Sequence, residues 1–453
     1  MFSAEPSEQA RWFAPASVFG IIAIGRALQI ADGFFRPEAI FWIASALVVL
    51  TGAAVAPRPI PYVRFDRPGV RLLALIGLIA QVWQLCTARP GWNMRPDPLS
   101  LAWFYAGVAA LGVLGVSAVW GSPRWATPLQ IGGLVAVHFV LGVWMIRHSP
   151  FPLIDVNLFQ RDAITALRHG IDPYGITFPD IYGPATYYYG PGMSVDGHLQ
   201  FGFPYPPLSL LLAWPGKLLG GDHRYAHLVA IQLAACLMAF ARPKGFGPIA
   251  AVLYLTTPRI FFVLQQSWTE PFVVLGVAAV VFVACRYSRA VPWLFGGFIA
   301  LKQYLVFALP AALLLMRWPV NRAQSRRLYG GAAIVAAAVT LPFFAWNPIG
   351  FWKSVVTLQL YQPFRPDALS VLAWWVDRGH AQPSPVVPFV VVAVASAVAV
   401  WRLPRTPAGF GAATAVIFLA FFAFNKQAFC NYYFFVVGAL AVTLAAWQPS
   451  DQS

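Results

Sequence analysis

Two aspartates stand where an apolar segment of the chain gives way to a polar one. Asp155 and Asp162 follow the apolar segment 126–147 and lie in a stretch whose apolar residues recur at helical spacing, namely Val156, Phe159, Ile164 and Leu167. This spacing predicts an amphipathic helix in the membrane interface, which Gly170 ends. A carboxylate at that depth can act as a general base toward a hydroxyl group, so Asp155 and Asp162 are the candidate catalytic residues.

Each of these aspartates also has a structural role open to it. Asp155 occupies the predicted N-cap of the helix, where a carboxylate can accept a backbone N–H. Asp162 follows seven residues later, about two helical turns, which places it on roughly the same helix face. Its structural alternative is an ion pair with Arg161 or Arg168. The sequence leaves both roles open for each residue.

Cations in the second half of the chain are candidates for binding an anionic substrate. Lys302 and Lys426 are predicted on the same side of the membrane as Asp155, and Arg365 lies in a long polar gap on that side. Lysine and arginine hold phosphate groups through charge-assisted hydrogen bonds, so these three are the candidate phosphate-binding residues. The alternatives are lysines that snorkel at helix ends and a local ion pair between Arg365 and Asp367.

Other polar and aromatic residues, which lie in the polar segments or at the ends of apolar ones, are candidates for binding the substrate. They share the predicted external side, and they are Tyr174, Tyr205, Glu270, Gln303 and Asn431. Tyrosine rings suit sugar stacking, although they are equally typical of a membrane interface. Glu270 is expected to pair with one of the lysines rather than to act as a base. The chain has no tight cluster of carboxylates, so neither a metal ion nor another cofactor is predicted.

The composition places all of these residues in a membrane protein. Of the 453 residues, 59% are apolar and only 10% are charged, against about 25% charged residues in ordinary soluble domains. So few charges cannot cover the surface of a soluble fold, and an aromatic content of 15% excludes a disordered chain. The net charge of +15 comes from small basic clusters between apolar stretches, so no nucleic-acid partner is expected.

Apolar segments of about 20 residues, the length that crosses a bilayer, recur along the chain. The first five are 13–33, 38–56, 69–88, 98–119 and 126–147. The later ones are 223–241, 246–265, 270–285, 290–301 with 303–316, 328–346, 386–402, 408–424 and 429–447. The predicted fold is therefore an all-α polytopic membrane protein of about 12–14 transmembrane helices with a large first external loop that carries the candidate base.

These segments divide the chain into three regions. Residues 1–147 form N-terminal transmembrane helices, 148–222 form an external loop, and 223–453 form C-terminal transmembrane helices with a second external loop at 347–385. The first loop holds the amphipathic helix and the segment 205–220, which is apolar but short and rich in proline. We expect this segment to be re-entrant, since broken backbone at membrane depth is tolerated where protein buries it. A full span is the alternative.

Basic residues in the short loops orient the spans. The clusters are Arg58 with Arg64, Arg67 and Arg71; Arg242 with Lys244; Arg286 with Arg289; Arg317 with Arg322, Arg326 and Arg327; and Arg402 with Arg405. Such clusters face the cytoplasm. The expectation is a multi-pass protein of the cytoplasmic (inner) membrane with both termini in the cytoplasm. Both long loops and the candidate site then lie on the extracytoplasmic face.

The motifs of the first loop resemble those of a known family. The pattern AL-x-x-G-x-DPY covers residues 166–174, and YPPL at 205–208 runs into an apolar segment. Later runs are LKQYLVFALPAALLL at 301–315, LQLYQPFRPDALS at 358–370 and NKQAFCNYYF at 425–434. The chain resembles the GT-C superfamily of integral-membrane glycosyltransferases, and most closely the bacterial polyprenyl-phosphate-mannose-dependent family 87 type. In that family the loop follows the first span, whereas four further spans precede it here.

The resemblance implies a hexosyltransferase of the cell envelope. It would move mannose, or another hexose or pentose, from a polyprenyl-phosphate donor to a lipid, glycan or protein acceptor on the outer face of the cytoplasmic membrane. The family's base is a carboxylate early in the first external loop, and the matching position is Asp155. The expected partners are therefore a polyprenyl-phosphate sugar, a glycan or glycolipid acceptor, and membrane lipid.

A polytopic transporter or lipid flippase is the alternative function. It would share the many spans and the charged residues within them. The sequence shows no inverted repeat, and its polar residues gather on one side rather than at the midplane of the membrane. Both features favour the transferase. A non-catalytic scaffold would leave the gathering of acids and lysines on one side unexplained.

Overall fold

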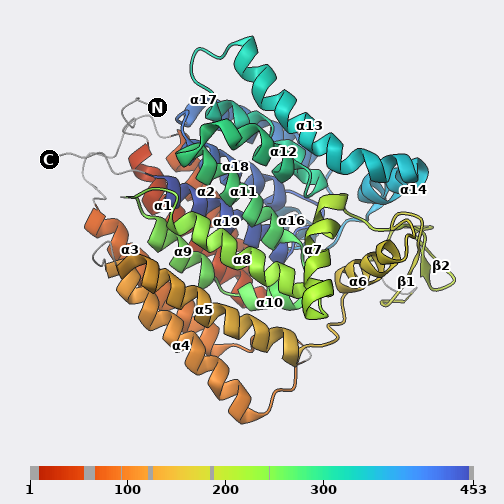
Figure 1. The fold of residues 1–453 in the computed structure, drawn as a ribbon, viewed down its shortest axis with the longest axis horizontal. Helices are drawn as coiled ribbons and strands as arrows, with labels where there is room; N and C mark the ends of the chain where they lie inside the picture. Colours follow the sequence, from red (N-terminus) through yellow and green to blue (C-terminus); the bar gives the residue numbers. More distant parts are fainter. Residues whose placement is uncertain are drawn as a thin grey trace.

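The computed structural model describes residues 10–55, 67–92, 94–120, 126–183, 188–243 and 245–447. The described chain is a body of packed helices with one small sheet (Figure 1). Within it, six helices are long and apolar enough to cross a membrane: α1 (Ala10–Ala31), α2 (Pro37–Val55), α3 (Arg67–Thr87), α4 (Pro98–Trp120), α5 (Ala126–His148) and α13 (Arg322–Trp346). The predicted all-α polytopic membrane protein is thereby confirmed.

Four shorter apolar helices also belong to the body, and two of them form its centre. They are α8 (Arg224–Ala239), α17 (Val387–Arg402), α18 (Pro407–Ala423) and α19 (Cys430–Ala446). Helices α18 and α19 are buried along their whole length, as expected for helices that are apolar on every side. Helix α1 packs against α2, α3 and α19. By contrast, α4 exposes Trp103, Val113 and Trp120, which suits a lipid-facing helix.

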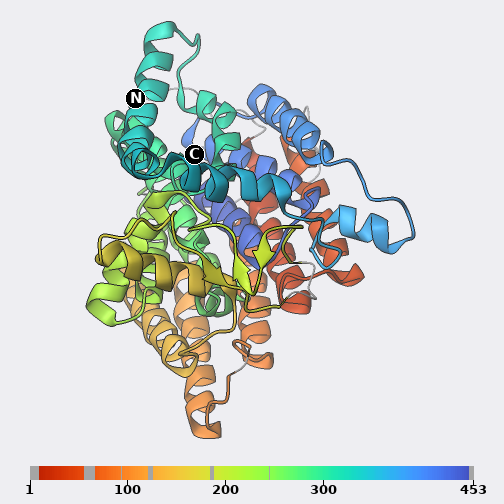
Figure 2. The same ribbon diagram turned by 90° about the vertical axis from the view of Figure 1, so that its right-hand side faces the viewer.

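The first loop folds over one end of this body. Helix α6 (Asp155–Arg168) is followed by the short strands β1 (Phe178–Pro179), β2 (Ser194–Val195) and β3 (His198–Leu199). They form an antiparallel sheet in the order β1-β3-β2. Figure 2 looks onto this end, with the sheet near the viewer. Helix α6 buries the apolar face that its spacing predicts, including Val156, Phe159 and Ile164.

Helix α7 (Pro207–Gly220) covers the segment expected to be re-entrant. It begins beside Tyr205, whose ring lies 4.0 Å from the Nζ of Lys302. It ends at Gly221, shortly before Arg224, whose guanidinium donates to the carbonyl of Ser149 just beyond the end of α5. Asp155 follows Ser149 by six residues. Both ends of α7 therefore lie at the same end of the helical body.

One of the expected spans is broken, and another pair of segments forms a hairpin. The prediction of one helix over 246–265 is wrong, because the structure has α9 (Gly247–Leu255), a turn, and α10 (Ile260–Gln265). Pro258 explains the break, since proline lacks an N–H and disfavours a helical residue before it. The expected segments 290–301 and 303–316 form a hairpin of α12 (Val291–Ile299) and the 3-10 helices η2 (Gln303–Ala308) and η3 (Pro310–Leu315). Lys302 lies at its turn.

Helix α11 (Glu270–Arg286) also belongs to the body, where it packs against α8 and α19. The remaining elements are connectors, namely η1 (Ser288–Ala290), α14 (Pro348–Trp352), the π-helix η4 (Lys353–Thr357), α15 (Leu358–Tyr361) and α16 (Val371–Asp377). The stretch from α14 to α16 lies over the same end as α6 and the sheet (Figure 2). There Asn347 donates to Asp172 of the first loop at 2.8 Å, so the two loops expected to be external meet.

The helical body therefore has two distinct ends. We call the end with α6, the sheet and the 347–385 loop the acidic end, because every Asp and Glu that the structure describes lies there. The opposite end is the basic end. It carries Arg286, bonded to the carbonyl of Phe240, and Arg405, bonded to the carbonyl of Leu313. Three cations of the predicted clusters, Arg58, Arg64 and Lys244, lie outside the described residues.

Candidate active site

A cavity of about 220 Å³ opens at the acidic end, and we call it the Asp155 cavity. It brings together five of the predicted site residues, namely Asp155, Tyr205, Lys302, Arg365 and Asn431. These come from the first loop, the α12–η2 turn, the second loop and α19, so residues far apart in the chain share one space. The other five predicted residues are absent from the described lining: Asp162, Tyr174, Glu270, Gln303 and Lys426.

Asp155 lies in the first turn of α6, where the cavity and the helix meet. The N-cap is Ile154, so the predicted capping position was off by one residue. Instead, Oδ1 of Asp155 accepts the N–H of Val156 at 2.7 Å, and Oδ2 accepts the hydroxyl of Tyr189 at 2.8 Å. The N–H of Asp155 donates to the Tyr182 hydroxyl at 3.3 Å. The carboxylate is thereby oriented by a backbone group of α6 and by a tyrosine from the segment between β1 and β2.

The surroundings of Asp155 favour a proton acceptor. Burial raises the pKa of its carboxyl group, and the hydrogen bonds from Tyr189 and Val156 with the charge of Arg365 offset only part of that effect. A carboxylate with a raised pKa is a stronger base than an exposed one. Burial beside this carboxylate also raises the pKa of Tyr189, so the tyrosine stays protonated as a donor.

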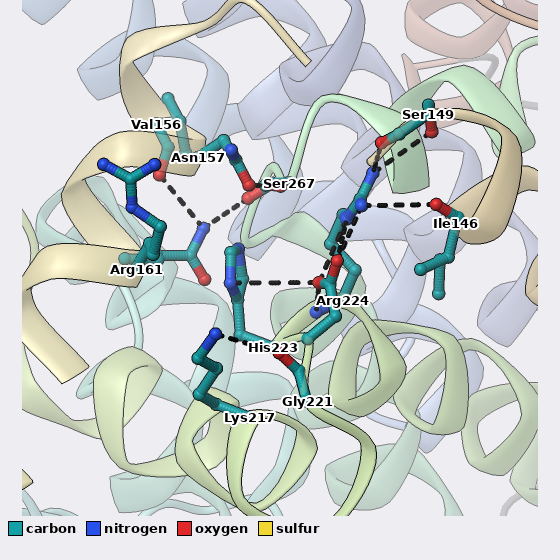
Figure 3. Close-up of polar contacts among 12 residues, drawn as sticks. Ile146, Ser149, Val156, Asn157, Arg161, Lys217, Gly221, His223, Arg224 and Ser267 are labelled. Carbon is teal, nitrogen blue, oxygen red and sulfur yellow. Dashed lines mark hydrogen bonds and ion pairs between the residues drawn. The ribbon is translucent and has the colours of Figure 1, made fainter. Parts of the chain in front are cut away.

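A buried polar network fixes α6 against the helical body (Figure 3). The side-chain amide of Gln160 donates to the carbonyls of Val156 and Ser267, and the hydroxyl of Ser267 donates to Asn157 Oδ1 at 2.9 Å. Nearby, fully buried Arg224 donates to the carbonyl of Ser149 at 2.8 Å. These bonds tie the first turns of α6 and the end of α5 to α8 and the α10–α11 turn, and so position Asp155.

The ammonium group of Lys302 reaches the cavity from a buried ion pair. Its Nζ lies 3.0 Å from Oε1 of Glu270, so the predicted pairing of Glu270 with a lysine is confirmed. The hydroxyl of Tyr304 donates to the same oxygen at 3.2 Å. The Nζ also lies 4.0 Å from the centre of the Tyr205 ring, a cation–π contact. Lys302 is only 4% exposed, so its charge is held in a dry position.

Arg365 is held in a similar way by a carboxylate and aromatic rings. Its guanidinium makes a bidentate pair with Asp367 at 2.7 and 2.6 Å, which confirms the structural alternative considered for these residues. The group also lies 4.0 Å from the Tyr188 ring and 4.8 Å from the Phe429 ring. Pairing does not remove Arg365 from the cavity, since it still forms part of the wall.

Lys426 and Gln303 donate hydrogen bonds to backbone carbonyls of the segments around the cavity. The Nζ of Lys426 donates to the carbonyl of Gln362 at 2.6 Å and to that of Leu360 at 3.1 Å. Burial lowers the pKa of Lys426. The amide of Gln303 donates to the carbonyl of Pro204 at 2.6 Å. The structure therefore separates Lys426 from Lys302, which the sequence had treated as equivalent.

Asp162 and Tyr174 also take positions away from the cavity. Asp162 is half-exposed and pairs with Arg161 at 2.7 Å, the alternative that the sequence left open. Tyr174 is 2% exposed, and its hydroxyl donates to the carbonyl of Tyr205 at 2.9 Å. In this position Tyr174 supports the backbone that carries Tyr205.

Several residues of the cavity were not singled out from the sequence. Tyr182 and Tyr189 contact Asp155. The run of three tyrosines at 187–189 is the sequence signal that could have pointed to this part of the loop, although Tyr187 itself lies outside the described residues. Trp92, from the α3–α4 loop, stacks on Phe34 with ring centres 5.5 Å apart. Because Trp92 and Phe34 adjoin the ends of ordinary spans, no local pattern distinguished them from interfacial aromatics.

Comparison with family models, with curated proteins and with solved structures finds no match to this chain. Among the residues that the structure describes, no three His, Cys, Asp or Glu side chains lie together in a way that could hold a metal ion.

Proposed function

We propose that the protein is an inverting glycosyltransferase that uses a polyprenyl-phosphate sugar. The observation that carries the proposal is the Asp155 cavity, which joins a carboxylate of raised pKa to two buried cations. A donor of this class needs both kinds of group, a base for the incoming hydroxyl and positive charge for the departing phosphate. The sequence resemblance to GT-C enzymes supports the same reaction.

The chemical step balances with these groups alone. Asp155 takes the proton of an acceptor hydroxyl, and the hydroxyl oxygen forms a bond to the anomeric carbon of the sugar. The bond from that carbon to the phosphate oxygen breaks, and polyprenyl phosphate leaves with the electron pair. Lys302 and Arg365 stabilise its negative charge, while the Tyr189 hydroxyl keeps the Asp155 carboxylate oriented.

The lining outside the charged groups suits a sugar. Side-chain amides of Gln266, Gln362 and Asn431 supply donors and acceptors for hydroxyl groups. Trp92 and Trp268 supply flat apolar faces on the same cavity. Mannose, another hexose or a pentose would each use such a lining, and the proposal extends to all three.

An apolar groove offers a place for the lipid part of the donor. A space of about 860 Å³ lies between α17 and the segment η2–η3, with Val306, Phe307, Phe389 and Trp401 among its walls. It begins four residues beyond Lys302 and extends to Arg405 near the basic end. A lipid tail in this groove would run through the apolar layer while its phosphate lies near Lys302.

A transfer assay with Asp155→Asn tests this function. Membranes that contain the full-length protein would receive a radiolabelled polyprenyl-phosphate mannose, and label transferred to extractable lipid or glycan would be counted. Loss of a general base lowers the rate about 10²–10⁴-fold, and asparagine keeps the shape of the side chain. Asp162→Asn is the matched control, since it changes a half-exposed carboxylate of the same helix that lies away from the cavity. Near wild-type transfer by Asp155→Asn would contradict the proposal.

A further inference from the structure

A second cavity lies at the acidic end beside the first, and arginine side chains dominate it. Its volume is about 560 Å³, and its charged walls are Asp32, Arg89, Arg95 and Arg259. We call it the arginine cavity. Trp92 lines both cavities, so one indole ring forms the wall that they share.

One of the three arginines is already neutralised. Arg259 pairs with Asp32, and its Nη1 donates to the carbonyl of Arg89 at 2.8 Å. The second oxygen of Asp32 accepts the indole N–H of Trp92 at 2.9 Å. Both Asp32 and Arg259 have positive φ, 54° and 68°, a conformation that surrounding contacts must impose on such residues. The pair is therefore a built part of the wall.

The other two guanidinium groups keep their charge for a ligand. Arg89 and Arg95 are exposed, and neither guanidinium has a hydrogen bond or ion pair to any residue that the structure describes. The nearby carboxylate of Asp97 is used as a cap, since it accepts the N–H of Ser100 at 2.8 Å. Three guanidinium groups against the single carboxylate of Asp32 leave a net charge of +2 on the cavity walls.

The loop that presents these arginines is docked rather than loose. Gln265, which is 1% exposed, accepts the N–H of Trp92 at 2.9 Å and donates to its carbonyl at 2.7 Å. A Cβ at Gly91 would lie 2.4 Å from the Gln265 side chain, so a larger residue there would displace the amide that holds Trp92. The positions of Arg89 and Arg95 are thus set by the body of the protein.

Exposed tryptophans flank the loop that carries Arg89 and Arg95. Trp83 is 69% exposed near the end of α3, and Trp103 is 70% exposed near the start of α4. Exposed tryptophans at span ends mark the boundary between the apolar layer and the headgroups. The α3–α4 loop with Arg89 and Arg95 lies just beyond those tryptophans, where guanidinium groups can hold a lipid phosphate through charge-assisted hydrogen bonds.

We propose that the arginine cavity binds the headgroup phosphate of a lipid, and that this lipid is the acceptor of the transfer reaction. Arg89 and Arg95 hold the phosphate through paired N–H donors. The polar head then extends past Trp92 and brings a hydroxyl into the Asp155 cavity. The acceptor role rests on the proposed function. The donor phosphate has its own cations, Lys302 and Arg365, which leaves this second site for the other substrate.

Lipid binding tests the site without any transfer reaction. Purified full-length protein in detergent would be titrated with dioleoyl phosphatidic acid, and native mass spectrometry would measure its occupancy against dioleoylglycerol, which lacks the phosphate. Arg89→Gln with Arg95→Gln should bind phosphatidic acid at least about tenfold more weakly. Arg168→Gln with Arg378→Gln removes the same charge from exposed positions at the same end, and it should bind as the wild type does.

The outcomes separate this inference from the proposed function. Unchanged binding of phosphatidic acid by the Arg89 and Arg95 double variant would overturn the site. Added inorganic phosphate is the second probe: if it displaces the bound phosphatidic acid, the site takes free phosphate and the lipid assignment is overturned. Asp155→Asn should still bind phosphatidic acid, so a failure of the transfer proposal leaves this result standing. In the transfer assay the double variant should raise the acceptor KM about tenfold with kcat retained. A lowered kcat with unchanged KM would overturn the acceptor role.

Discussion

The two ends of the helical body carry their charges in different ways. At the acidic end, buried cations are matched with carboxylates, as in Lys302 with Glu270 and Arg365 with Asp367. At the basic end, arginines bond to backbone carbonyls or lie over rings, as Arg405 does over Trp318 at 4.8 Å. No Asp or Glu that the structure describes lies near them.

This difference separates two uses of positive charge. Arginines at span ends suit retention on the cytoplasmic side where their end of the body carries no described Asp or Glu, whereas Arg89 and Arg95 share the acidic end with every described carboxylate. A buried cation loses its hydration energy even when a carboxylate pairs with it, and such buried charges gather at functional sites. The contrast therefore supports the proposed site at the acidic end, and each experiment below tests one end of the body or one of its charged groups.

The largest expected effect is the difference in cysteine labelling between the two ends in intact cells, which shows which end faces the outside of the membrane. In a variant without the four natural cysteines, His198→Cys marks the acidic end and Arg322→Cys marks the basic end; both positions are exposed. A membrane-impermeant maleimide added to intact cells should label the first and leave the second unlabelled until the cells are permeabilised. The opposite labelling would invert the proposed topology and remove the argument for an external active site.

The next effect comes from breaking a matched pair inside the cavity. Lys302→Met should lower kcat about 10²–10³-fold, as loss of one electrostatic donor to a transition state does. It should also lower stability by about 3–5 kcal/mol, because Glu270 is left buried without its partner. Thermal unfolding and the transfer assay measure the two effects.

A double variant tells these effects apart. Lys302→Met with Glu270→Gln removes both charges and should recover most of the lost stability. If transfer stays low, Lys302 acts on the substrate. If transfer returns with stability, the lysine only balances Glu270, and the matched pairs of the acidic end would be structural.

The sequence predicted the matched pairs better than it predicted the geometry of the cavity. Placing Glu270 and Lys302 on one side needed only the order of spans and the positive-inside rule. The break at Thr256–Arg259 was missed, because the apolar composition of 246–265 masked the effect of Pro258. Tyr189 and Trp92 reach Asp155 and its cavity through folded loops, and loop contacts leave no periodic pattern to detect.

A smaller effect is expected on the pH profile. The base must be unprotonated, so transfer should fall as the pH drops through the raised pKa of Asp155. The Tyr189 hydrogen bond lowers this pKa, so Tyr189→Phe should move the acidic limb of kcat to higher pH, by about one unit for one charged hydrogen bond. Tyr174→Phe removes a hydroxyl from the same loop without touching Asp155, and its limb should stay in place. A shift to lower pH in Tyr189→Phe would contradict the role of Asp155.

The smallest effect is expected at Lys426, the lysine that lies outside the described cavity lining. Lys426→Met removes the bonds to the carbonyls of Leu360 and Gln362, so the segment that places Gln362 in the wall loses an anchor. Transfer should fall by less than about tenfold, because hydrogen bonds from a charged group to backbone contribute roughly 1.5–3 kcal/mol and only part of that acts on the cavity. Lys217→Met is the matched control, since Lys217 also donates to a backbone carbonyl, that of Gly221 at 2.9 Å, away from the described lining. A loss as large as that of Lys302→Met would show that a matching carboxylate does not distinguish the cations that act on the substrate.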